Sequence, residues 1–197
     1  MKTIRLIRHA ESVANVGKKT ASPETVGLTD TGREQARELA CKIAEQPDLI
    51  ITSPFIRTLQ TAEPLLDKFP DAKQEQWPIQ EFTYLSPDKC NDTSMEDRIP
   101  LAMEYWERND PHYCDGDRAE SFAFFVYRVA DFKNKIQNRA ERNIIVFSHY
   151  QFIAACKWMN ADNPKMTSGD AMADFRQYLF SHNLKNAEII YIEPNKL

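Results

Sequence analysis

The chain has 197 residues, of which 42% are hydrophobic and 27% charged; this balance is typical of a folded globular protein and excludes a disordered chain. Its length suits one domain, residues 1–197, with a large core. The formal net charge of -4, with no basic run longer than Lys18-Lys19, argues against nucleic acid as a partner.

The N-terminus begins directly with a strand pattern and not with a basic region followed by a long apolar stretch. No run of about 18 apolar residues occurs in the chain. We therefore expect a cytoplasmic protein without a membrane partner. The cysteines are widely separated, which predicts reduced thiols instead of a zinc site or a redox motif: Cys41, Cys90, Cys114 and Cys156.

Apolar runs alternate with helical periodicity along the chain, as in β-α units that form a mostly parallel sheet. Strands are predicted at about residues 3–8, 48–52, 143–148 and 187–192. Between the first two strands, residues at i, i+3, i+4 and i+7 predict an amphipathic helix: Ala36, Leu39, Ala40 and Ile43. Thr29 or Asp30 is its expected cap.

A longer helix is predicted by a broad stripe of large apolar side chains that we expect in the core: Phe122, Phe125, Val126, Val129, Phe132 and Ile136. The proline-rich segment before it, from Phe69 to Gly116, has little strand pattern and one helical stretch near residues 94–108. We interpret residues 69–116 as an insertion that covers the sheet edge where a site would open.

Polar residues stand at the ends of three predicted strands. The first strand ends in Arg8 and His9, Ser53-Pro54 follows the second, and the third ends in Ser148-His149. Ligands of open α/β sheets bind beyond the carboxyl ends of the strands. Ser53 as N-cap and Pro54 as first helical residue would place Arg57 in a first helical turn, where backbone N–H groups favour an anion.

Four ordered motifs cover almost the whole chain: Arg8-His9-x-Glu11-Ser12-x-x-Asn15, Leu28-Thr29-x-x-Gly32-x-x-Gln35-Ala36, Ser53-Pro54-x-x-Arg57-x-x-Gln60-Thr61-Ala62 and Ser148-His149. Their order and separations resemble the histidine phosphatase superfamily. The resemblance implies the phosphoglycerate-mutase-like fold, a three-layer α/β/α sandwich with a mostly parallel central sheet. It also implies a phosphomonoester hydrolase that acts on a small phosphorylated substrate through a phosphohistidine.

The resemblance further implies that His9 accepts the phosphoryl group, that Arg8, Arg57 and His149 cradle the phosphate, and that Asn15 helps to bind it. This assignment agrees with the chemistry, because phosphoryl transfer needs an in-line nucleophile and positive groups around the equatorial oxygens. A neutral imidazole can attack, and a protonated His149 would add a charge and a donor. No metal or other cofactor is then required.

The leaving alkoxide also needs a proton donor. Some members of the family carry an acid directly after the second histidine, but here Tyr150 follows His149. In other members the acid is a glutamate in the insertion, and Glu81 resembles it; apolar neighbours would raise its pKa. Glu120 is the alternative, although its position just before a long helix favours a capping role.

Several questions stay open at the level of sequence. Ala10 and Tyr150 stand where the family usually has glycine, and each adds bulk beside the phosphate. A phosphoglycerate-type mutase is one alternative function, although family mutases are generally longer. A non-catalytic phosphate-binding protein is another, but it would not need both a nucleophile and an acid.

Aromatic residues of the insertion could line the substrate site or pack a small core: Trp77, Phe82, Tyr84, Tyr105 and Trp106.

Overall fold

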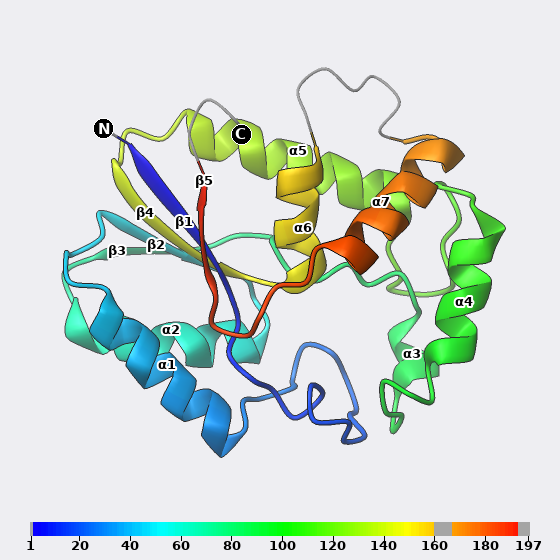
Figure 1. Ribbon diagram of the computed structural model, residues 1–197, viewed down its shortest axis with the longest axis horizontal. Helices are drawn as coiled ribbons and strands as arrows, with labels where there is room; N and C mark the ends of the chain where they lie inside the picture. Colours follow the sequence, from blue (N-terminus) through cyan, green and yellow to red (C-terminus); the bar gives the residue numbers. More distant parts are fainter. Residues whose placement is uncertain (1, 160–166, 193–197) are drawn as a thin grey trace.

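Five strands form the central sheet in this computed structural model, which describes residues 2–159 and 167–192 (Figure 1). Their order in space is β3-β2-β4-β1-β5. The strands are β1 (Thr3–Arg8), β2 (Leu49–Thr52), β3 (Lys73–Gln76), β4 (Asn143–Ser148) and β5 (Ile189–Ile192). All neighbouring pairs are parallel except β1 and β5, which confirms the mostly parallel sheet.

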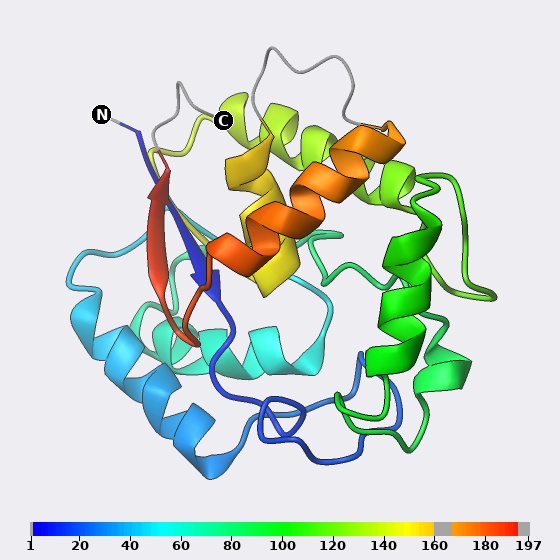
Figure 2. The ribbon, with the colours of Figure 1, turned by 45° about the vertical axis from the view of Figure 1, so that its right-hand side comes forward.

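Helices cover both faces of this sheet, as Figures 1 and 2 show from two directions. On one face α1 (Asp30–Lys42) and α2 (Ile56–Lys68) pack against side chains of β1, β2 and β4. On the other lie α5 (Phe122–Gln137), α6 (Tyr150–Trp158) and α7 (Gly169–Ser181). Because both faces are covered, the central strands are continuous apolar runs, and the predicted three-layer α/β/α sandwich is confirmed.

One strand gave no signal in the sequence. β3 is Lys73-Gln74-Glu75-Gln76, polar throughout; it pairs only with β2 at the edge of the sheet, where exposed polar side chains are tolerated. The four strands predicted from the sequence therefore do not include β3, at the start of the segment of residues 69–116. Its remainder carries α3 (Pro87–Cys90) and α4 (Ile99–Arg108), and α4 lies within the predicted helical stretch.

The helix starts differ from one another in how well the sequence predicts them. Thr29 caps α1, and its hydroxyl oxygen accepts a hydrogen bond from Gly32 N. The prediction of Ser53 as the cap of the next helix is wrong, because α2 begins at Ile56 with Phe55 as its N-cap. The Ser53 hydroxyl instead lies 2.7 Å from His149 Nε2, in the buried interior.

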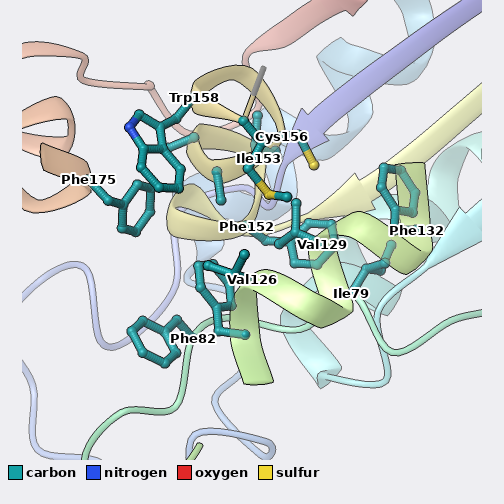
Figure 3. Close-up of a cluster of buried hydrophobic side chains, with 14 of the residues drawn as sticks. Ile79, Phe82, Val126, Val129, Phe132, Phe152, Ile153, Cys156, Trp158 and Phe175 are labelled. Carbon is teal, nitrogen blue, oxygen red and sulfur yellow. The ribbon is translucent and has the colours of Figure 1, made fainter. Parts of the chain in front are cut away.

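The apolar stripe of α5 packs in the core as predicted, and all six of its members are buried. Figure 3 shows side chains of α5, α6 and α7 meeting in this cluster, with Phe82 at one end. The ring of Phe82 stacks on Phe125, with 4.4 Å between the ring centroids. This packing anchors the segment that carries Glu81, the residue before Phe82.

The cysteines differ in their exposure. All four cysteines are free thiols; Cys41 and Cys114 are exposed, whereas Cys90 and Cys156 are buried. None of the helices in the described part of the chain is long and apolar enough to cross a membrane.

Candidate active site

The register of the sheet brings three predicted site segments together. Arg8 pairs with Ser148 across β1 and β4, and His9 N donates a hydrogen bond to Ser148 O at 2.9 Å. On the other side of β4, Ser53 N donates to Phe147 O at 3.1 Å. The residues that follow β1, β2 and β4 therefore lie side by side at one edge of the sheet.

A cavity of about 400 Å³ opens at this edge. Most of the residues singled out in the sequence line it: Arg8, His9, Asn15, Arg57, Glu81 and Tyr150. His149 is not one of the described residues that line the cavity. Of the aromatic residues considered for a substrate wall, Phe82 and Tyr84 line the cavity, whereas Tyr105 and Trp106 are buried beside them in the core.

His9 is 4% exposed, and its Nδ1 lies 2.8 Å from the carbonyl oxygen of Ala10. Because a carbonyl only accepts hydrogen bonds, we assign the proton to Nδ1, which leaves the lone pair on Nε2. Burial, followed by the positive charge of Arg57, holds the pKa of His9 well below its ordinary value of 6.5. At neutral pH the ring is thus an uncharged imidazole, the form that can act as a nucleophile.

His149 is fully buried and is hydrogen-bonded to Arg57. Arg57 Nη2 donates to His149 Nδ1 at 2.9 Å, since a guanidinium has no acceptor. The proton of the neutral ring is then on Nε2, which donates to Ser53 Oγ at 2.7 Å. Burial, and next the charge of Arg57, hold the pKa of His149 well below 6.5, so this fully buried ring is neutral and orients Arg57.

Arg8 and Arg57 bring positive charge to the cavity. Arg57 Nη1 donates to Pro23 O at 2.6 Å, and Arg8 Nη1 donates to Leu184 O at 2.5 Å. Burial lowers the pKa of Arg57 to about 10, which still leaves the group charged at neutral pH. Arg8 Nε is buried and has no partner among the described residues. Two oriented guanidinium groups on one cavity favour a phosphate, whose oxygens accept paired N–H donors.

Asn15 is held in position by its own side-chain oxygen. Asn15 Oδ1 accepts hydrogen bonds from the backbone and hydroxyl of Ser12, at 3.0 and 2.9 Å, and from Asn186 Nδ2 at 3.2 Å. These contacts set the orientation of the amide, and its other end, the Nδ2 donor, remains for a ligand in the cavity that Asn15 lines.

Glu81 is the carboxyl group of the cavity wall. Its Oε1 accepts hydrogen bonds from the backbone N–H groups of Gln151 at 2.9 Å and Phe82 at 3.3 Å. Burial raises the pKa of Glu81 above its ordinary value of 4.5, against the opposing charges of Arg57 and Arg8. Glu81 consequently keeps its proton to a higher pH than an exposed glutamate, as a general acid requires.

Glu120 occupies a different environment. Arg128 Nε and Nη2 donate to its two carboxylate oxygens at 2.8 and 2.7 Å, and both side chains are largely buried. Glu120 is not the cap of α5, because Ser121 is. Arg128 Nη1 also donates to Pro78 O and Gln80 O, so this ion pair holds the segment leading to Glu81. A single arginine within the apolar stripe of α5 is the sequence signal that could have revealed it.

The remaining motif residues hold the loop after β1 in place. Thr61 Oγ1 accepts from Ala10 N at 3.0 Å, and Gln35 Oε1 accepts from Glu11 N at 2.9 Å. Gly32 lies against the same loop: a Cβ atom there would lie 2.0 Å from Glu11 O, which excludes any other residue without a backbone shift. These residues of α1 and α2 act on the site through the backbone that carries His9.

Neither Ala10 nor Tyr150 needs the conformational freedom of glycine, since neither has a positive φ angle. Ala10 is a fully buried residue of the loop after β1. The Tyr150 hydroxyl hydrogen-bonds to the carbonyl oxygens of Leu179 at 2.5 Å and His182 at 3.0 Å, near the end of α7. Its ring borders the cavity next to the Arg8 guanidinium, 5.4 Å from the ring centroid. The hydroxyl is therefore engaged with the protein backbone.

Metal ligation is not a feature of the described residues: within them, no three or more His, Cys, Asp or Glu side chains are grouped as a metal site.

Comparisons with known proteins agree with this fold. The family model of the histidine phosphatase superfamily (branch 1) matches residues 4–171. The structure of an α-ribazole phosphatase from Shigella flexneri superimposes with a TM-score of 0.71 at 20% identity, over 97% of this chain and 90% of that chain. A phosphoserine phosphatase from Entamoeba histolytica, in complex with 3-phosphoglyceric acid, gives 0.70 at 21% identity, over 97% and 90%.

A putative α-ribazole-5′-P phosphatase from Escherichia coli K-12 has a TM-score of 0.67 and 23% identity, over 87% of this chain and 83% of that chain. No curated protein sequence matches. At these identities the solved structures show a shared fold. The family model, in contrast, covers most of the 197 residues, including the strand ends that form the cavity. The chain belongs to the histidine phosphatase superfamily, branch 1.

Proposed function

We propose that the protein is a metal-independent phosphatase that hydrolyses a small phosphomonoester through a phosphohistidine at His9. The observation that carries the proposal is the position of His9 on the same cavity as Arg8 and Arg57, with its Nδ1 against Ala10 O, so that Nε2 is the nitrogen left to attack. Phosphatase names among the structural neighbours support it. Glu81, on that cavity as well, supplies the acid that a phosphate-binding protein without catalysis would not need.

In the first step the phosphoryl group binds between Arg8 and Arg57, with Asn15 Nδ2 as a further donor. His9 Nε2 attacks phosphorus in line with the ester oxygen, so that an N–P bond forms as the P–O bond breaks. Glu81 donates its proton to the departing oxygen, which leaves as an alcohol. The arginines stabilise the charge on the equatorial oxygens throughout.

In the second step water attacks the phosphohistidine. Glu81, now a carboxylate, takes a proton from the attacking water; an O–P bond forms and the N–P bond breaks. Inorganic phosphate leaves, and His9 and Glu81 return to their starting forms. His149 does not enter either step; it holds Arg57 through Nδ1 and is held by Ser53.

Inhibition by vanadate tests whether this is the phosphate pocket. Arg57→Ala removes a buried charge that would face the anion, so we expect the inhibition constant for vanadate to rise about 10²-fold, with a similar loss in kcat/KM for an aryl phosphate. Arg37→Ala, on the exposed surface of α1, is the matched control and should change neither value. Equal vanadate inhibition of both variants would place the pocket elsewhere.

The pH dependence of kcat/KM follows from the two shifted groups. The lowered pKa of His9 keeps the nucleophile neutral as the pH falls through 6.5, so the acid limb should lie below that value. The raised pKa of Glu81 means that the acid is lost only as the pH rises above the ordinary 4.5. We expect a bell-shaped profile, measured from about pH 4 to 9, with an acid limb below 6.5 from His9 and a basic limb above 4.5 from Glu81. A loss of activity centred at 6.5 on the acid side would contradict the neutral His9.

Chelation should leave activity intact. In this mechanism the guanidinium groups of Arg8 and Arg57 perform the charge stabilisation that a divalent ion provides in other phosphatases. Turnover of an aryl phosphate after dialysis against EDTA should therefore equal that of the untreated protein. Loss of activity that a divalent ion restores would refute metal independence.

A further inference from the structure

The cavity continues beyond the phosphate-binding residues into a part that we term the outer chamber. Its walls include Val26, Leu85, Pro87, Cys90, Met95 and Ile99. They come from two segments far apart in sequence: the loop between β1 and α1, and the segment that carries α3 and α4. Figure 2 shows these segments next to each other, and a bridge between Thr20 and Thr93 joins them.

Arg98 hydrogen-bonds to both of these segments. Its Nη2 donates to Thr20 Oγ1 at 2.8 Å and to Thr93 O at 2.6 Å, and its Nε donates to Thr93 Oγ1 at 2.7 Å. Among the described residues that line the cavity, Arg98 is the sole Lys, Arg, Asp or Glu side chain apart from Arg8, Arg57 and Glu81. The chamber therefore combines apolar walls with one arginine whose Nε and Nη2 donate to the protein.

The apolar surface of the chamber is partly uncovered. Met95 and Ile99, which line it, are 56% and 53% exposed. A volume of about 400 Å³ is within the range of small-molecule sites and provides room for more than a phosphate. Because the chamber is continuous with the phosphate-binding end, the group esterified to a bound phosphate is the part of a ligand that would cover these side chains.

We infer that the substrates are phosphomonoesters whose esterified group is uncharged and mainly apolar, an alkyl or aryl group. This inference rests on the proposed function. Each methylene that enters the chamber leaves water for apolar walls, which is favourable. A carboxylate in the same place loses its hydration, and Arg98, whose Nε and Nη2 are held by Thr20 and Thr93, replaces only part of it. Phosphorylated acids should consequently be poor substrates.

The test is a series of unbranched alkyl phosphates from ethyl to hexyl. The basicity of the leaving alkoxide is nearly constant along this series, so differences report on the chamber. We expect kcat/KM to rise about fourfold for each added methylene. For the matching phosphates with a terminal carboxylate, kcat/KM should not increase with chain length. It should be at least about tenfold lower than for the alkyl compound of the same length.

Two variants of α4 distinguish the chamber from a general effect of the surface. Ile99→Asp places a charge in the chamber wall and should flatten the dependence on chain length. Met103→Asp is the matched control, since Met103 is 48% exposed on the same helix but does not line the cavity, and it should keep the full dependence.

The outcomes separate the two proposals. Three results would overturn the apolar chamber without affecting the proposed phosphatase activity. They are a kcat/KM that does not depend on chain length, a preference for the carboxylated compounds, and an equal loss of the dependence on chain length in both variants. Failure to hydrolyse any phosphomonoester, aryl phosphates included, would overturn the proposed function itself.

Discussion

Replacement of His9 by alanine is expected to lower kcat/KM by roughly 10⁴-fold or more, because it removes the atom that forms the bond to phosphorus. The wild-type protein, quenched rapidly during a single turnover of radiolabelled substrate, should carry label in an acid-labile and alkali-stable form. His9→Ala should carry none. Since the imidazole makes one hydrogen bond with the described residues, through Nδ1 to Ala10 O, the fold should persist and phosphate should still bind.

His112→Ala provides the control for this experiment. His112 is exposed, so its loss should leave both turnover and labelling unchanged. Label that survives in His9→Ala would assign the nucleophile to another residue. A wild-type protein that hydrolyses its substrate without any trapped phosphoenzyme would instead indicate direct attack by water.

Glu81→Gln should have an effect that depends on the leaving group. The amide cannot donate a proton as the carboxylic acid does, so kcat/KM for an alkyl phosphate should fall by about 10²- to 10⁴-fold. An aryl phosphate, whose phenolate departs with little help from an acid, should lose far less. The basic limb of the pH profile for the alkyl phosphate should also disappear, since that limb reports the ionisation of Glu81.

Glu120→Gln is the matched control, because it alters a carboxylate of the same type outside the cavity lining. It weakens a buried ion pair with Arg128, and the expected loss in the free energy of unfolding is about 3 kcal/mol. Its effect on the two substrates should be equal. If Glu120→Gln instead shows the dependence on the leaving group and Glu81→Gln does not, Glu120 is the general acid.

Much of the architecture could be predicted from the sequence because it depends on the local periodicity of apolar residues. β2 and β4 are nearly continuous apolar runs, since helices cover both faces of the sheet, and β1 is mainly apolar apart from its arginines. The stripe of α5 has the spacing of one buried helix face. β3 was not predicted because its strand, Lys73–Gln76, lies at the edge of the sheet with exposed side chains and therefore needs no apolar pattern. The segments that border the cavity could likewise be predicted, because parallel strands end at one edge.

Tertiary structure alone decided how those side chains are paired. The sequence places His9 and His149 at strand ends alike, but His9 donates to Ala10 O beside the cavity, whereas Arg57 and Ser53 occupy both nitrogens of His149. The sequence favoured Glu81 and left Glu120 as the alternative, and the fold puts Glu81 on the cavity and Glu120 on Arg128. Tautomers, ionisation and burial depend on partners distant in sequence, and only the packing of the strands and helices brings those partners within hydrogen-bond distance.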